Sequence, residues 1–163
     1  MHPDPPLRPP AHRVSPRAVQ WWRLRALILL VVLTAPQVVA LLVAGATGPI
    51  WTFPVLTGLV TAGYALVVPG LRFRIHRFEV TDEAVYTLSG WLTREWRIAP
   101  ISRVQTVDTQ HGPLQQLLRL ATVTVTTASA RGAVTIAGLD AGDAAELARS
   151  LTATTQATPG DAT

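Results

Sequence analysis

Few residues in this chain have the types and spacing that acid–base or metal chemistry requires. The chain holds four histidines and no cysteine, so neither a disulfide framework nor a thiolate metal site is available. The closest acid–histidine pair, Asp108 and His111, spans the end of an expected strand and lacks a nucleophile. Neither a Gly-rich phosphate loop nor an HExxH pattern occurs. The sequence therefore predicts no catalytic residue, no cofactor and no metal site, and a protein that is not an enzyme.

A second kind of chemistry, the binding of anionic lipid, is suggested by three arginines. Arg72, Arg74 and Arg77 follow directly after a long uncharged stretch at residues 26–71. Basic residues beside a membrane gain about 1 kcal/mol each from anionic lipid. The same three residues are also explained if they only anchor the orientation of a membrane helix. We treat them as candidate lipid head-group contacts, with topology anchoring as the simpler alternative.

The uncharged stretch contains two apolar runs that must position these arginines. Residues 26–44 and 50–68 are each long enough, as helices, to cross the ~30 Å hydrocarbon core of a bilayer. The short link between them predicts a transmembrane helical hairpin at residues 26–69. A buried hairpin in a soluble protein would rarely be so free of charge. A signal peptide cleaved after Ala44-Gly45-Ala46 is a weaker alternative, because the apolar run is long and begins far from Met1.

Charge and small residues give the expected orientation and packing of the hairpin. All 14 basic residues are arginines, and they lie on both sides of the hairpin but not in its connecting loop. The positive-inside rule then places the N-terminus and the residues after the hairpin in the cytoplasm, as in a multi-pass protein of the bacterial plasma membrane. Gly58 and Ala62 form a small-xxx-small pair, a candidate helix-packing site for the first helix or another subunit. Trp21, Trp22 and Trp51 are expected at the bilayer interfaces.

The segments that flank the hairpin differ from it in composition. Residues 1–25 are basic and rich in proline, which predicts a cytoplasmic tail that is disordered as far as Pro16. Residues 71–151 carry strand patterns and one amphipathic helix, enough for one small domain. Residues 152–163 are polar and are expected to form a disordered tail.

Six strands are expected within the domain. The alternation of apolar and basic residues from Leu71 to His76 predicts the first strand, which continues to Val80 after a bulge near Arg77. The other five are expected at residues 84–88, 91–98, 104–110, 122–127 and 133–137.

The periodicity also predicts which side chains form the core. Leu92, Trp96 and Ile98 are expected to point inward from the third strand, and Val123 and Val125 from the fifth. A short helical turn should pack Leu114, Leu117 and Leu118. The closing helix should be held by an apolar stripe at Ala144, Leu147, Ala148 and Leu151.

The order of these elements and four segments resemble a known family. The segments are Arg77–Tyr86, Gly90–Trp96, Ile101–Val107 and Gly112–Val125. Together they are similar to YdbS-like membrane proteins with a bacterial pleckstrin-homology (PH) domain, over roughly residues 20–151. The resemblance implies a two-helix transmembrane hairpin followed by a PH-like antiparallel β partial barrel with a C-terminal α-helix. A PH fold has seven strands, so one strand remains to be placed.

The resemblance implies a fold more than a function. PH domains that bind inositol phosphates use basic residues in and between the first two strands, whereas the loop here, Thr81-Asp82-Glu83, is acidic. The leading hypothesis is a membrane-anchored PH-like binding or scaffold module that assembles with membrane proteins, or with copies of itself, at the cytoplasmic face. A peripheral anionic-lipid sensor at the same face is the alternative. The net charge of +4 does not favour nucleic acid, because the arginines are spread along the chain.

Overall fold

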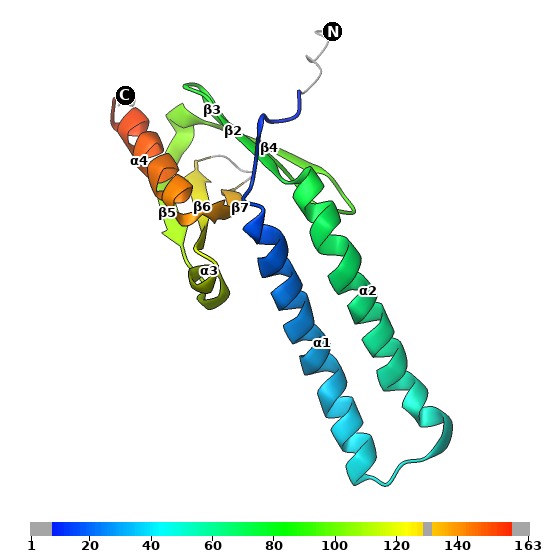
Figure 1. The fold of residues 1–163 in the computed structure, drawn as a ribbon. Coiled ribbons are helices and arrows are strands. Elements are labelled where there is room, and N and C mark those ends of the chain that lie inside the picture. The colour runs from blue at the N-terminus through cyan, green and yellow to red at the C-terminus, as the bar shows by residue number, and fades with distance from the viewer. Residues whose placement is uncertain (1–7, 129–131, 158–163) are drawn as a thin grey trace.

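The fold consists of a long helical hairpin that carries two antiparallel sheets and a closing helix. The computed structural model describes residues 8–128 and 132–157. The hairpin is formed by α1 (Arg17–Val43) and α2 (Thr52–Ile75), joined through a short 3₁₀ helix, η1 (Gly48–Trp51). Figure 1 shows the hairpin projecting from one side of the sheets, with its connecting loop at the far end. Both helices are long and apolar enough to cross a membrane.

Both helices are longer than the apolar runs predicted. α1 begins at Arg17 instead of residue 26, and α2 continues past Pro69 to Ile75. The prediction of a strand from Leu71 to His76 is therefore wrong. A proline removes one N–H from a helix and crowds the carbonyl one turn earlier, but the turns that follow it can continue when packing favours them. Here Phe73 packs against the core of the domain from the last turn of α2.

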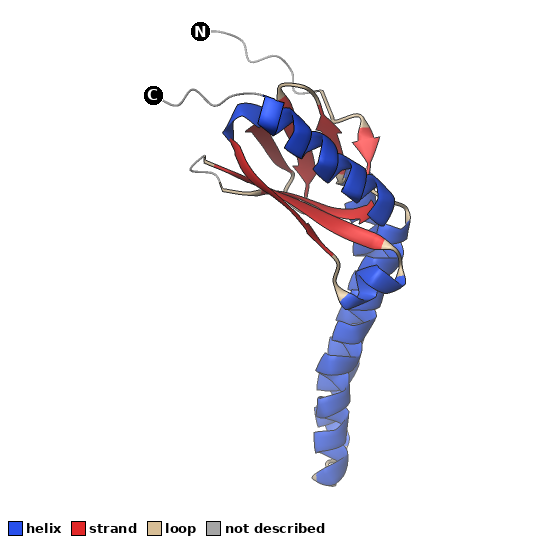
Figure 2. Cartoon of the chain, turned by 90° about the vertical axis from the view of Figure 1, so that its left-hand side faces the viewer, coloured by secondary structure: helices blue, strands red, loops and turns tan. Residues whose placement is uncertain are grey.

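Two sheets follow the hairpin. Sheet A contains, in spatial order, β1 (His12–Arg13), β2 (Arg77–Val80), β3 (Ala84–Ser89) and β4 (Glu95–Pro100). Sheet B contains β5 (Val104–Gln110), β6 (Leu120–Thr127) and β7 (Val134–Asp140). The connections include η2 (Ile101–Arg103) and α3 (Pro113–Leu117), and α4 (Ala141–Ala157) lies across the strands (Figure 2). The predicted fold class is confirmed, with two sheets that do not close into a full barrel within the described residues.

The seventh strand comes from the segment that precedes the hairpin. β1 pairs antiparallel with β2, so that Arg13 lies opposite Arg77. Further along, the N–H of Ser15 donates to the carbonyl of Gly138 in sheet B at 2.9 Å. The prediction of disorder up to Pro16 is wrong for residues 8–16, because their backbone groups pair with both sheets. The preceding seven residues lie outside the described part of the chain.

The first turns of α1 belong to the core of the domain. Ala18, Trp21 and Trp22 are at most 9% exposed and cluster with buried residues of both sheets. A Cβ added to Gly138 in β7 would lie only 2.7 Å from the Cβ of Ala18. The two tryptophans therefore lie inside the domain instead of in the interfacial belt that the sequence suggested. The hairpin and the sheets share one core.

Sheet B and α4 follow the predicted packing closely. Val123 and Val125 of β6 are fully buried, and Ala144 and Leu151 of α4 are 0% and 1% exposed. α4 continues to Ala157, so the predicted tail is wrong for residues 152–157. Threonine hydroxyls in this segment, such as that of Thr152, donate to carbonyls one turn earlier and satisfy the helix locally. Residues 158–163 lie outside the described part of the chain.

The side of β4 that faces the core is not the side that the sequence predicted. Ile98 is 47% exposed, and the Nη1 of Arg97 donates to the carbonyl of Ala133, just before β7, at 2.8 Å. The prediction that Leu92, Trp96 and Ile98 point inward is therefore wrong. The strand begins only at Glu95, after a turn, and its pairing with β3 places the small Ala99 inward.

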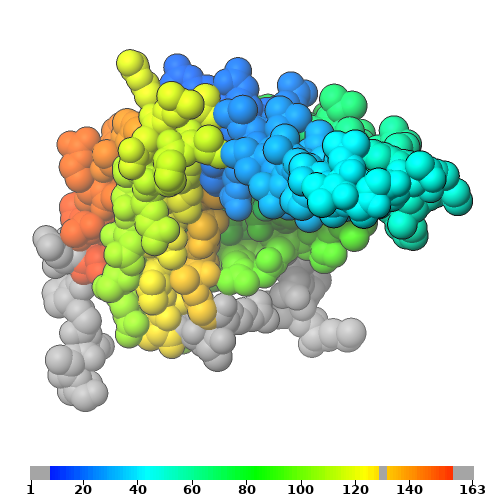
Figure 3. Space-filling view, turned by 90° about the horizontal axis from the view of Figure 1, so that it is seen from below, coloured from blue at the N-terminus to red at the C-terminus, as the bar shows by residue number. Residues whose placement is uncertain are grey.

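One of the three leucines predicted to pack from the short helix α3 is exposed instead. Leu114 and Leu118 pack against the core, as predicted, but Leu117 is 76% exposed. A single turn of helix can bury only one side, and Leu117 lies on the other. Figure 3, viewed from the side of the hairpin tip, shows the region around α3 beside the hairpin on the same face of the domain.

Candidate functional site

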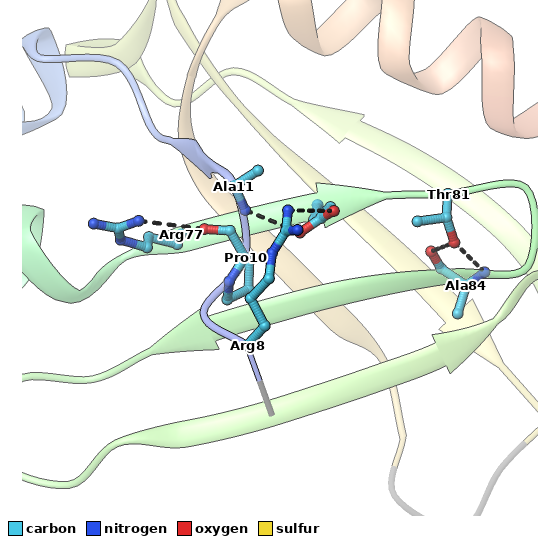
Figure 4. Close-up of polar contacts among 7 residues, drawn as sticks. Arg8, Pro10, Ala11, Arg77, Thr81 and Ala84 are labelled. Carbon is cyan, nitrogen blue, oxygen red and sulfur yellow. Dashed lines mark hydrogen bonds and ion pairs between the residues drawn. The ribbon is translucent and has the colours of Figure 1, made fainter. Parts of the chain in front are cut away.

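The three arginines predicted as lipid contacts do not form one cluster. Arg77 lies half-buried in β2, and its Nη1 donates to the carbonyl of Pro10 at 3.5 Å (Figure 4). Arg74 is exposed in the last turn of α2. Arg72 is half-buried, with its guanidinium carbon 5.3 Å from the ring centroid of Trp22 in α1. The segment before the hairpin thus contacts Arg77, while Arg72 turns toward the other helix.

Arg72 shares a cleft with Arg25 between the two helices, close to the sheets. The cleft has a volume of about 300 Å³. Arg25 and Arg72 are the basic residues that bound the uncharged stretch at its two ends, and the antiparallel hairpin brings these ends together. The lining residues are Trp22, Arg25, Ala26 and Leu29 of α1 and Tyr64, Val68, Pro69 and Arg72 of α2.

This cleft, which we call the junction cleft, is lined by two positive charges and by no carboxylate. The sequence has no Asp or Glu between Asp4 and Glu79, so neither helix can supply one. The ion pairs in the described part of the chain are formed by other arginines. The Nε of Arg72 is buried and has no hydrogen-bond partner among the described residues. An unpaired donor of this kind costs about 1–3 kcal/mol.

Aromatic rings hold both guanidinium groups of the junction cleft. The guanidinium carbon of Arg25 lies 5.3 Å from the ring centroid of Trp21, a distance equal to that between Arg72 and Trp22. Each cation–π contact of this kind contributes about 0.5–2 kcal/mol. Because both tryptophans are buried in the domain core, the rings are fixed in position. The two charges are therefore preorganised.

His76 lies beside the cleft but does not add a third charge. Its ring contacts Trp22 edge-on at a centroid distance of 5.1 Å, and its Nδ1 lies 2.9 Å from the carbonyl oxygen of Arg72. Burial, and next the charge of Arg72, lower the pKa of His76 to about 4, although the hydrogen bond to the carbonyl favours the protonated ring. His76 is therefore neutral at physiological pH.

The turn between β3 and β4 reaches along α2 toward the middle of the hairpin. Trp91 packs edge-on against Tyr64, with ring centroids 6.2 Å apart, and Leu92 is 81% exposed. Tyr64 precedes the end of α2 at Ile75 by about three turns, or roughly 16 Å along the helix axis. Figure 1 shows this turn beside the upper part of α2. Trp91 therefore lies beside the uncharged part of α2, below the level of Arg72.

A second apolar surface lies on the outer side of sheet A. Ile98 lies opposite Tyr86 of β3, and Trp96 points to the same side of β4 because side chains alternate along a strand. Tyr86 and Trp96 are half-exposed, and Ile98 is exposed. We call these three residues the outer patch. In the part of the chain that the structure describes, β4 pairs only with β3, which leaves its other backbone edge unpaired.

Comparison with known proteins agrees with this architecture. The family model described as bacterial PH domain matches residues 25–155. The chain belongs to the bacterial PH domain family. This bacterial PH domain protein is 31% identical over 130 residues to the UPF0699 transmembrane protein YdbS of Bacillus subtilis (strain 168), a match that covers 74% of this chain and 78% of that relative. No solved structure matches the chain significantly.

The acidic turn of this bacterial PH domain is unsuited to an inositol phosphate. Thr81, Asp82 and Glu83 connect β2 to β3 and are all exposed. The hydroxyl of Thr81 closes the turn by bonding to the backbone of Ala84 (Figure 4). Figure 1 shows the turn at the end of sheet A that points away from the hairpin. Both its charge and its distance from the membrane side disfavour lipid binding there.

The candidate helix-packing residues lie within the hairpin. A Cβ added to Gly58 would lie 3.7 Å from the Cγ2 of Thr34 in α1, so this position faces the first helix. Ala62 is half-buried, whereas Thr61 and Ala65 are the first two buried residues of α2 that follow Gly58 along the helix. A role for Gly58 and Ala62 in contacts with another subunit stays a prediction.

Sequence reasoning missed Arg25 and Tyr64 as parts of a site, and it left open whether Trp91 is an exposed contact or packs inside the domain. The signal for Arg25 was present, because Arg25 and Arg72 are the first charges on either side of the uncharged stretch. The contact between Tyr64 and Trp91 had no such signal, since it depends on how far the β3–β4 turn reaches along α2.

Proposed function

We propose that this bacterial PH domain protein is a membrane-seated scaffold that binds a membrane-protein partner at the cytoplasmic face of the plasma membrane. The observation that carries the proposal is the outer patch beside the unpaired edge of β4. Aromatic and large apolar residues are enriched in the centres of protein interfaces. An unpaired strand edge next to them offers N–H and C=O groups to an extended segment of a partner.

The way in which the hairpin enters the domain supports this role. Ala18 and Trp22 of α1 lie in the same core as both sheets, which holds the outer patch at a fixed height above the membrane. A partner that spans the same membrane could contact α2, the turn at Trp91 and the outer patch together. The partner that fits is a membrane protein with an extended, partly apolar cytoplasmic segment next to a transmembrane helix.

The proposal concerns binding and not catalysis, because neither the family description nor the name of the relative refers to a reaction. Its cytoplasmic orientation rests on the distribution of arginines, which flank the hairpin on the side of the sheets.

In-cell photocrosslinking tests the proposal. A photoreactive amino acid placed at Ile98 of the full chain should crosslink to one membrane protein. The same probe at Thr109, an exposed residue on β5, an edge strand of sheet B, should not. The Ile98→Arg substitution should then abolish co-purification of that protein. It should leave the melting temperature unchanged, because the side chain is already 47% exposed.

The possible outcomes distinguish the candidate partners. A crosslinked product of twice the chain mass would identify a second copy of this chain as the partner. Absence of any protein product at Ile98, or equal crosslinking at Thr109, would exclude the outer patch as the docking surface. The alternative function, an anionic-lipid sensor, is favoured by a different observation, namely the charge of the junction cleft.

A further inference from the structure

We propose that the junction cleft binds the phosphate of an anionic glycerophospholipid from the leaflet next to the domain. The cleft is defined by Arg25 and Arg72, with Trp22 and Tyr64 among its other lining residues. This site is different from a PH-type pocket in the strand loops, and it shares no residue with the outer patch. The proposal therefore stands or falls independently of the scaffold function.

The two positive charges of the cleft have no negative partner in its lining, which favours the binding of an anion from outside the chain. Two guanidinium groups line a space of about 300 Å³, and no acidic residue lies in the sequence between Asp4 and Glu79. A phosphate diester presents several oxygens, and guanidinium groups bind such oxygens with charge-assisted, often bidentate hydrogen bonds. One phosphate could thus satisfy both arginines.

The positions of the two arginines are fixed before any ligand binds. Each guanidinium group lies against a tryptophan ring of α1, and both rings are at most 9% exposed. Side chains held in this way lose little conformational freedom when they bind a ligand. Arg74 has no cation–π contact among the described residues and would act only as a diffuse charge.

The depth of the cleft selects a lipid over a soluble phosphate. Arg25 and Arg72 lie at the two ends of the uncharged stretch, which is the level of lipid phosphates when α1 and α2 span the bilayer. Below the arginines the lining is apolar, with Leu29 and Val68, so it can accept the glycerol and the first acyl carbons of the same lipid. A free phosphate would leave this part of the cleft unfilled.

The absence of a carboxylate among the lining residues also predicts which head groups are preferred. A zwitterionic head group carries an ammonium that would lie near two guanidinium groups with no carboxylate to pair with. Phosphatidylglycerol and other lipids with a net negative head group avoid this repulsion. We therefore expect selectivity for anionic over zwitterionic phospholipid of the same acyl chains.

Native mass spectrometry of the full chain in mild detergent tests the proposal. Phosphatidylglycerol should remain bound as a one-to-one adduct under conditions that remove phosphatidylethanolamine. The double variant Arg25→Gln/Arg72→Gln should lower the retained phosphatidylglycerol by about tenfold. The matched control, Arg23→Gln/Arg74→Gln, removes two exposed charges from the same helix ends outside the cleft lining and should retain the lipid. If the first double variant does not fold, Arg25→Gln alone should still weaken retention, because Arg25 is exposed and is not one of the buried core residues, although its guanidinium group lies against Trp21.

Three results would overturn the proposal. Retention of phosphatidylethanolamine equal to that of phosphatidylglycerol would mean that the cleft does not discriminate between head groups by their charge. An equal loss in the matched control would mean that the overall field of the helix ends attracts the lipid, not the cleft. Displacement of the lipid by millimolar glycerol 3-phosphate would identify a site for soluble phosphate instead.

Discussion

Gly138 of β7 and Ala18 of α1 approach so closely that a Cβ on the glycine would lie 2.7 Å from the Cβ of the alanine. The backbone of Gly138 also accepts a hydrogen bond from Ser15, immediately before α1. This contact joins the membrane hairpin to the sheet that is farthest along the chain. Because of this contact, the start of the hairpin packs as part of the domain and is not only a flexible tether to the membrane.

The Gly138→Ala substitution tests this contact. Gly138 has a φ of +85°, which disfavours any other residue, and an added methyl group would collide with Ala18. We expect the free energy of unfolding to fall by about 1–3 kcal/mol, measured by thermal melting of the full chain in detergent. The control is Gly132→Ala, which has a similar φ of +75° but open space around it, and should cost clearly less. Equal losses would show that backbone strain alone accounts for the effect.

The closing helix gives a second prediction. Leu151 is 1% exposed, so Leu151→Ala should destabilise the domain by about 2–5 kcal/mol. Leu117→Ala removes the same atoms from a side chain that is 76% exposed and should change the melting temperature little. The full chain is needed, because a fragment that begins at Leu71 would lack Ala18, Trp22 and β1 from the core. An unchanged melting temperature for Leu151→Ala would contradict the packing of α4 on the sheets.

A third prediction concerns pH. The pKa of His76 is lowered from 6.5 to about 4 in the folded chain, so the unfolded chain takes up a proton at higher pH than the folded chain does. Its contribution to stability is therefore complete above pH 6.5, falls as the pH drops toward 4, and changes no further below that. The His76→Gln variant should show a smaller loss of melting temperature across this window. Parallel curves for the two proteins would exclude His76 as a source of the pH dependence.

The topology proposed from the arginines can be measured with single cysteines, since the chain has none of its own. Thr47, in the loop at the hairpin tip, and Ala145, on α4, are both exposed. A membrane-impermeant thiol reagent should label Thr47→Cys in intact cells and should label Ala145→Cys only after the cells are opened. The reverse pattern would place the domain outside the cytoplasm.

The sequence predicted the architecture well where one interaction dominates. The length and lack of charge of the uncharged stretch favoured a hairpin. Val123 and Val125 were identified as core because β-branched residues alternate with threonine in a strand buried on one side. Prediction failed where two patterns coincide. From Leu71 to Ile75, alternating basic and apolar residues read as a strand, yet packing of Phe73 against the core continues the helix.

The same division applies to the candidate site. The sequence by itself determined that an acid-free segment with arginines at both ends would enter a membrane, because composition and length alone decide that partition. Only the tertiary structure decided which arginines meet. Arg77 is drawn to the carbonyl of Pro10, whereas Arg25 and Arg72 come together because antiparallel helices of similar length return the chain to its starting level. Register likewise decided that Ile98 faces outward, since a shift of one residue along a strand exchanges its two sides.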